Sequence, residues 1–182
     1  MIIAGAELKQ LVKDGVISGL LSEDQINAAS IDLTLSDTIL VEPMVGKPTT
    51  IRLQERDSIV FNEMTITGSN YTLAPGEFIL ASTNEVFNLP NNISCMYKLK
   101  SSMARAGLDH LNAGWCDAGW HDSVLTLEFV NVTNRVDIVL DHNTKIGQVI
   151  FFKHAAVGKD QSYATKGSYN KQTTATSTRV GK

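Results

Sequence analysis

The sequence predicts a mainly β protein, with the strands arranged as a sandwich, jelly roll or barrel. Three observations support this fold class. Apolar and polar residues alternate in many short runs, turn-forming residues separate the runs, and only one or two segments have helical periodicity. A chain of 182 residues falls in the usual range for one domain, so we expect a single domain over residues 1–182.

The first predicted element is a short amphipathic helix over residues 5–14. Leu8, Leu11 and Val12 recur at helical spacing, and Gly15 provides a stop. Strands follow, beginning where Ile31, Leu33 and Leu35 alternate with polar residues. Further strand-like runs are IRL (51–53), YTL (71–73), EFILAS (77–82), SCMYKL (94–99), SVLTLEFVNV (123–132), DIVL (137–140) and GQVIFF (147–152). The turn signals between them are Pro75-Gly76, Asn84, Pro90 with Asn91-Asn92, and Asp141-His142-Asn143.

The last predicted element is a tail over residues 158–182, which is rich in Ser, Thr, Lys, Gly and Gln. Such a composition buries too little apolar surface to order itself. The tail is expected to be a frayed terminus, or a lid that orders when a ligand binds.

The balance of charges limits the kinds of partner. The chain has 16 basic and 19 acidic residues, a net charge of −3, which argues against a nucleic acid bound through bulk charge. Two cysteines, Cys95 and Cys116, are too few for a disulfide framework. Glu7 and Lys9 interrupt the apolar start of the chain, and no stretch reaches membrane-spanning length. We therefore expect a cytoplasmic protein without membrane contact.

The segment KSSMARAGL (100–108) is suited to an anion. Ser101 and Ser102 begin a short helical pattern, where hydroxyls and free backbone N–H groups can donate to phosphate oxygens. Lys100 and Arg105 add positive charge. The alternative interpretation is an ordinary capped helix, and the pattern by itself does not decide between the two.

Glu128 stands in the middle of an apolar strand. In SVLTLEFV, alternation puts Leu125, Leu127 and Phe129 on one face and Glu128 on the other, with Val124, Thr126 and Val130. A carboxylate between apolar neighbours suits general acid/base chemistry, because it can accept a proton from water and deliver it to a leaving group. The alternative is a glutamate on the solvent face of an edge strand.

A glycine-bracketed turn, AGWCDAGW (113–120), lies between these two groups. Glycines let the backbone approach a flat ligand closely, and Asp117 could accept a hydrogen bond from a sugar hydroxyl. Trp115 and Trp120 are interpreted as core or interface anchors, and Cys116 as a small buried apolar side chain.

Zinc is not expected. Zinc-dependent nucleobase deaminases carry an H-x-E motif followed by P-C-x-x-C, and neither occurs here. His110, Cys116 and His121 lack the spacing that zinc sites favour.

The chain resembles the dCTP deaminase family along nearly its whole length. The blocks that carry the resemblance are QINAASIDLTL (25–35), APGEFILASTNEVFNLP (74–90), KSSMARAGL (100–108), HLNAGWCDAGW (110–120), TLEF (126–129), IGQVIF (146–151) and SYNKQ (168–172). The resemblance implies a distorted β-barrel or jelly roll of the dUTPase-like type. It also implies a homotrimer with each active site at a subunit interface, and Mg²⁺ bound to the nucleotide triphosphate.

The resemblance also implies roles for individual residues. Glu128 matches the family's catalytic glutamate, which activates water for attack on C4 of cytosine without zinc. Ser101 and Arg105 match residues that orient the water and the glutamate, and Ala113 matches a residue whose backbone fixes base and water. The implied substrate-binding residues are Lys100 and Ser102 in the phosphate loop, Asp117 at the sugar 3′-hydroxyl, Gln148 from the adjacent subunit, and Tyr163, Lys166, Tyr169 and Gln172 in the tail.

Two differences from the family leave the substrate open. The phosphate loop begins with Lys100 where the family usually has Arg, so a bidentate fork is lost. Ser168 precedes Tyr169 where the family has Lys, with Lys166 and Lys171 nearby as substitutes. The expected reaction is deamination of dCTP to dUTP, with or without a further step to dUMP and diphosphate. The alternatives are a dUTPase, a deaminase that prefers dCMP or a modified cytosine nucleotide, and a non-catalytic trimeric nucleotide sensor.

Overall fold

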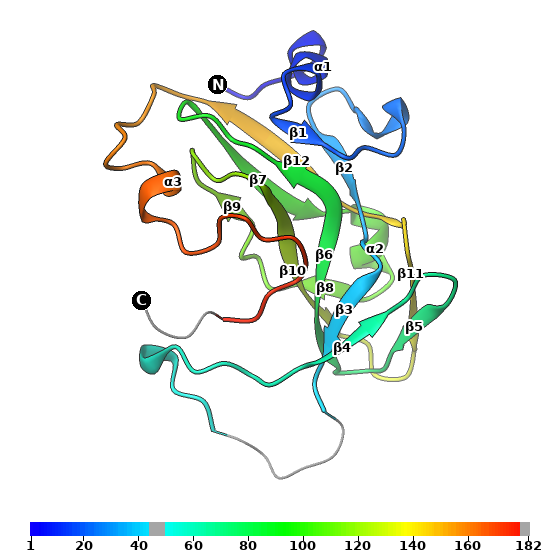
Figure 1. Cartoon of the computed structure of the whole chain (residues 1–182). Coiled ribbons are helices and arrows are strands. Elements are labelled where there is room, and N and C mark those ends of the chain that lie inside the picture. Colours follow the sequence, from blue (N-terminus) through cyan, green and yellow to red (C-terminus); the bar gives the residue numbers. More distant parts are fainter. Residues whose placement is uncertain (44–49, 179–182) are drawn as a thin grey trace.

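The strands form two antiparallel sheets (Figure 1). The sheets pack against each other with a cluster of apolar side chains between them. The computed structural model describes residues 1–43 and 50–178. Within this part, the first sheet has the order β4 (Asn62–Thr65), β3 (Thr38–Val41), β6 (Phe78–Phe87), β10 (Ser123–Asn131) and β8 (Leu108–His110), and β1 (Ile17–Ser18) also pairs with β6. The second has the order β2 (Ile31–Thr34), β12 (Lys145–Lys153), β7 (Ile93–Leu99) and β9 (Trp115–Cys116). A separate ribbon pairs β5 (Asn70–Leu73) with β11 (Ile138–Asp141).

The predicted mainly β fold of the jelly-roll type is confirmed, although the described sheets do not close into a barrel. The chain crosses repeatedly from one sheet to the other, as from β6 to β7 and from β9 to β10. One cluster of buried side chains joins the two sheets. Its members include Ile79, Leu127 and Phe129 from the first sheet and Leu33, Val149 and Phe151 from the second.

The predicted N-terminal helix is confirmed as α1 (Ala6–Lys13), which buries Leu8 and Leu11. Gly15 follows it with a φ of 72°, a left-handed conformation that glycine adopts without steric strain. The remaining helices are short: α2 (Ser101–Arg105), α3 (Tyr163–Lys166), and the single turns η1 (Glu23–Gln25) and η2 (Leu53–Glu55). No helix in residues 1–43 and 50–178 combines the length and hydropathy that a membrane crossing requires.

Two local predictions are wrong. Residues 51–53 are not a strand, because the Arg52 amide donates to the Asp57 carboxylate at 2.8 Å and the chain turns into η2. Asn84 is not in a turn but inside β6. Its side-chain amide bonds Thr34 Oγ1 at 2.9 Å, at a place where the register between β6 and β10 shifts. The shift has the form of a β-bulge, which accommodates Asn84 without ending the strand.

The tail packs onto the first sheet as far as it is described. Val124 N donates to Gln172 O at 2.8 Å at the start of β10. Ser162, Gln172 and Ala175 are buried. Residues 158–178 therefore pack against the rest of the fold, and residues 179–182 of the predicted tail lie outside the described part.

Candidate functional site

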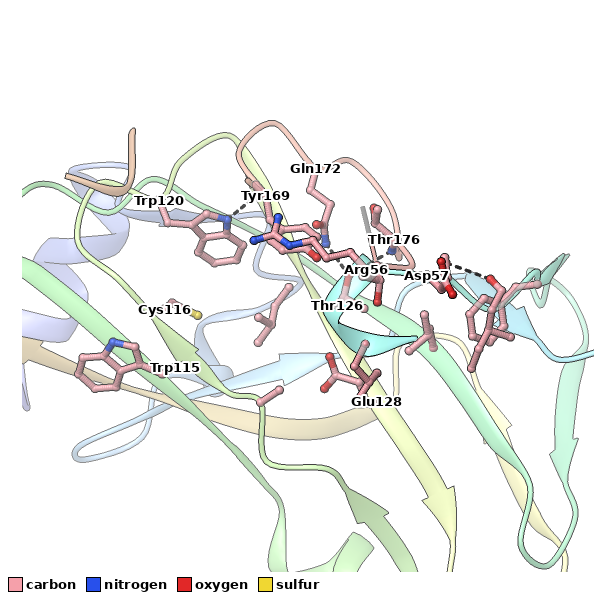
Figure 2. A pocket seen from close by; sticks show the side chains of 18 of the residues that line it. Arg56, Asp57, Trp115, Cys116, Trp120, Thr126, Glu128, Tyr169, Gln172 and Thr176 are labelled. Carbon is pink, nitrogen blue, oxygen red and sulfur yellow. Dashed lines mark hydrogen bonds between the residues drawn. The ribbon is translucent and has the colours of Figure 1, made fainter. Parts of the chain in front are cut away.

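A cavity of about 440 Å³ lies where β10 meets the tail and the segment 113–120. Thr126 and Glu128 of β10 form one wall, and Ala113 and Asp117 contribute another. Residues of the segment 51–61 and of the tail complete the lining. Figure 2 shows Thr126 and Glu128 along one strand, with Gln172 and Tyr169 of the tail nearby. The cavity has the size and mixed lining of a small-ligand site.

Glu128 is held in the interior of a sheet and not at its edge. β10 lies between β6 and β8, and Glu128 is the direct partner of Leu80 on β6. The predicted alternation is confirmed: Leu127 and Phe129 are fully buried, whereas the Glu128 side chain is 23% exposed and lines the cavity. This excludes the edge-strand interpretation of Glu128.

His110 is the nearest titratable neighbour of Glu128. Its Nε2 lies 3.2 Å from Glu128 Oε2, and its side chain is 4% exposed. Its Nδ1 accepts a hydrogen bond from the Asn112 backbone N–H at 3.1 Å. The Tyr97 ring packs on the imidazole with a centroid distance of 4.5 Å. Burial and the negative charge of Glu128 raise the pKa of Tyr97, so its hydroxyl stays protonated.

The segment 113–117 is anchored to β7 beside this group. Gly114 O accepts from Tyr97 N at 2.8 Å, and a Cβ at Gly114 would lie 2.9 Å from Tyr97 O. This close backbone approach puts Ala113 in the cavity wall. Asp117 also lines the cavity, and its Oδ1 accepts from Trp115 Nε1 at 2.8 Å.

Three predicted tail residues, Tyr163, Tyr169 and Gln172, line the cavity. Tyr169 O accepts from Trp120 Nε1 at 2.8 Å, and the Gln172 side-chain amide donates to Thr126 Oγ1. Lys166 lines a neighbouring cavity of about 410 Å³ instead, which shares Asp117, Tyr163 and Tyr169 with the first. The tail therefore forms part of the site.

Five further predicted residues line neither of the two cavities: Lys100, Ser101, Ser102, Arg105 and Gln148. Lys100 Nζ forms an ion pair with Asp32 Oδ2 at 2.7 Å, and Gln148, the direct partner of Asp32, accepts from Ser30 Oγ at 2.9 Å. Ser101, Ser102 and Arg105 are exposed on α2. Within one chain, the predicted residues thus form two groups: those that line the two cavities and those that lie away from them.

The interpretations of Trp120 and Cys116 are confirmed. Trp120 is 5% exposed and stacks on Phe87 at 5.3 Å, and Cys116 is buried opposite Cys95 on β7. Trp115 is 55% exposed, so it is not part of the core. Within residues 1–43 and 50–178, no group of three or more His, Cys, Asp or Glu side chains could hold a metal ion.

The sequence alone does not indicate a role in the site for His110, Tyr97 or the segment 51–61. Its motifs raise His110 only as a possible zinc ligand. Its place beside Glu128 comes from the pairing of His110 with Phe129 across β8 and β10, which is a long-range contact. One local signal could have indicated this position of His110: it lies just before the segment 113–120, which contributes Ala113 and Asp117 to the cavity.

Comparisons with known proteins give a consistent result. The family model described as dCTP deaminase-like matches residues 2–154. A relative from Nanoarchaeum equitans (strain Kin4-M), named "dCTP deaminase, dUMP-forming", is 34% identical over 199 residues, which are 100% of this chain and 98% of the relative.

Two solved structures are similar in fold. The 2′-deoxycytidine 5′-triphosphate deaminase from Agrobacterium tumefaciens aligns with a TM-score of 0.65 and 23% identity, over 82% of this chain and 48% of that one. This chain thus spans about half the length of that structure. The dUTPase from Streptococcus mutans aligns with a TM-score of 0.50 and 14% identity, over 78% of this chain and 98% of that one. The two likenesses confirm the dUTPase-like fold.

Proposed function

The chain belongs to the dCTP deaminase-like family, and from that premise we propose that it deaminates dCTP hydrolytically and continues to dUMP and diphosphate. The observation that carries the proposal is Glu128, a carboxylate in the wall of a nucleotide-sized cavity and in the interior of an apolar sheet. A dUTPase would not need a proton-transferring group at this position. The second step is supported by the name of the relative from Nanoarchaeum equitans.

In the proposed deamination, Glu128 takes a proton from water while the water oxygen bonds to C4 of cytosine, and the C4–N3 π bond opens with its electron pair on N3. That pair re-forms the C4–N3 bond as the bond from C4 to the amino nitrogen breaks, and Glu128 gives its proton to the departing ammonia. The proton of the C4 hydroxyl moves to N3, which gives uracil. Ala113 is proposed to fix the base and the water through its backbone, since it lies in the same cavity wall. Asp117 is proposed to accept from the 3′-hydroxyl, since it lines the same cavity.

We propose that the activation of water rests on Glu128 and not on zinc. The support is the carboxylate in the cavity wall, together with a sequence that lacks the zinc-deaminase motif. Mg²⁺ enters as part of the substrate, since a hard cation binds the phosphate oxygens of dCTP. Tyr163, Tyr169 and Gln172 are proposed to close over the nucleotide, and Lys166 to approach its phosphates from the neighbouring cavity.

We propose a homotrimer in which a neighbouring subunit supplies Lys100, Ser101, Ser102, Arg105 and Gln148. The separation of these residues from the cavity supports this arrangement, because one chain alone leaves Glu128 without them. Among the described residues, no acidic side chain pairs with the exposed Arg105 guanidinium. Large exposed apolar side chains, among them Leu111, Val132 and Val136, also favour burial against another subunit.

The experiment that tests the proposal is anion-exchange analysis of products from dCTP with Mg²⁺, beside dCMP and dUTP as substrates. The protein is treated with EDTA and then given Mg²⁺ but no zinc. Under these conditions we expect conversion of dCTP to dUMP and diphosphate. Stoichiometric dUTP without diphosphate would refute the second step. Inert dCTP with cleaved dUTP would identify a dUTPase, conversion of dCMP alone a dCMP deaminase, and binding without any turnover a sensor.

A further inference from the structure

His110 is held in one tautomer by the backbone that follows it. Asn112 has a φ of 61°, and its N–H donates to His110 Nδ1 at 3.1 Å. A ring nitrogen that accepts a hydrogen bond carries no proton, so the proton of the neutral imidazole lies on Nε2. The turn at Asn112 therefore determines which nitrogen of His110 can act as a donor.

The donor nitrogen of His110 faces the catalytic carboxylate. Nε2 and Glu128 Oε2 are 3.2 Å apart, but their alignment falls short of a good hydrogen bond. These two atoms and Tyr97 Oη are buried without a hydrogen-bond partner among the described residues. Buried polar atoms are nearly always satisfied, so these three atoms, one on the carboxylate and two on its neighbours, point to a polar guest such as a water or a substrate group.

Aromatic packing fixes the plane of the imidazole. Tyr97 lies on it at a centroid distance of 4.5 Å and an interplanar angle of 47°, and Phe129 meets it at 5.8 Å and 69°. Tyr97 is itself confined by Gly147, where a methyl group would overlap the phenol ring. The ring of His110 therefore cannot turn its Nε2 away from Glu128 without displacing two packed aromatic side chains.

We propose that His110 is the positioning residue of Glu128. Resting on the proposed function, the inference is that Nε2–H, 3.2 Å from Oε2, orients the carboxylate toward the water whose proton it accepts. The second carboxylate oxygen is then left to take that proton. His110 itself exchanges no proton and contacts no reacting atom.

The alternative role for His110 is purely structural, as a buried ring that satisfies Asn112 and packs on Tyr97. The two roles differ in what a substitution changes. Loss of a structural ring weakens folding and nucleotide binding together, whereas loss of a positioning donor lowers kcat and leaves binding intact.

The test uses the full chain with His110→Gln and His110→Asn, measured for dCTP turnover, KM and thermal unfolding. Gln can place an N–H donor near the position of Nε2, whereas Asn is too short to reach Glu128. We expect His110→Asn to lower kcat about 10²-fold with KM within about 3-fold, and His110→Gln to lose about 10-fold or less. His142→Asn, a histidine between β11 and β12, serves as the matched control and should have the kcat of the original chain.

Two further measurements complete the test. In a Glu128→Gln background, His110→Asn should have no additional effect on kcat, because its contribution passes through Glu128. Nitrogen NMR of the histidine side chains should identify the Nε2–H tautomer of His110, which needs no variant to fold. Equal losses in the two variants, an unchanged kcat in His110→Asn, or an Nδ1–H tautomer would overturn the inference. Absence of deamination by the original chain would instead refute the proposed function.

Discussion

A site that is shared between subunits can be tested by placing its two halves on different chains. Glu128→Gln removes the carboxylate from the cavity, and Arg105→Ala removes the guanidinium that is exposed on α2 in one chain. Each variant alone should be inactive, because in the proposed homotrimer every site then lacks one half. Mixed trimers should regain activity, because some sites then take an intact Glu128 from one subunit and an intact Arg105 from its neighbour.

The size of the recovery follows from the arrangement. In a random equal mixture, each half of a site is intact with a probability of one half, so about a quarter of the sites carry both. If both halves came from the same chain, no site in any mixture would be complete. A site shared between subunits therefore predicts recovery of about a quarter of the original activity in the whole mixture, whereas a site within one chain predicts no recovery.

The assay is dCTP turnover by co-expressed variants with two different tags, purified through both tags so that only mixed oligomers remain. The selection removes the trimers made of one variant only, which are inactive, so the expected fraction of complete sites in the purified sample rises from about a quarter to about a third. A mixture of Glu128→Gln with the double variant Glu128→Gln and Arg105→Ala is the matched control, and it should stay inactive. Activity of the first mixture no higher than that of the control would refute the shared site.

Three further predictions concern single residues. Glu85 is fully buried and accepts from Gln25 Nε2 and Thr34 Oγ1, each at 2.8 Å, yet burial raises the pKa of its carboxyl. The folded chain therefore holds this proton more tightly than the unfolded chain, and the free energy of unfolding should fall as pH rises from the ordinary carboxyl pKa to the raised one. Urea unfolding across this range should show that slope, and Glu85→Gln should flatten it; identical slopes would contradict the assignment. Gln172→Ala removes the contact of the tail with Thr126 and should raise KM about 5- to 30-fold, with faster tryptic cleavage of the tail but an unchanged unfolding temperature of the remaining fold. An unchanged cleavage rate would show that Gln172 does not hold the tail. Gly147→Ala should destabilise the fold by about 1–3 kcal/mol in urea unfolding, since a methyl group would displace Tyr97, and an unaltered stability would mean that the ring has room to move.

The sequence predicts well the features that depend on neighbouring residues. The helix over residues 5–14 and the strand around Glu128 follow from local periodicity, and the structure confirms both. The segment 51–53 has the composition of a strand, but the Arg52 backbone amide donates to the Asp57 carboxylate instead of to a neighbouring strand. A pattern of apolar residues cannot predict such a hydrogen bond to a side chain. Asn84 shows the same limit, because a polar residue can sit in a bulge inside a long strand as well as in a turn.

The sequence predicts candidate site residues, but it does not predict how they are arranged in space. Glu128, Ala113 and Asp117 share one cavity, as their motifs indicate. The role of His110 depends on the pairing of β8 with β10 and on the backbone amide of Asn112, which alternation along one strand cannot reveal. The motifs that contain Glu128 and Arg105 are close in the sequence. Because the chain crosses between the two sheets, Arg105 does not line the cavity that contains Glu128 in the same chain.

The most direct test of the central claim is a paired measurement of nucleotide affinity and turnover in Glu128→Gln. The amide keeps the shape of the carboxylate but cannot accept a proton from water. The account predicts that Kd for dCTP stays within about 3-fold while kcat falls between about 10² and 10⁴-fold. The matched control is Glu63→Gln on β4, an exposed glutamate outside the cavity, which should change neither value. Retained turnover in Glu128→Gln, or an equal loss of affinity and turnover, would contradict the role assigned to Glu128.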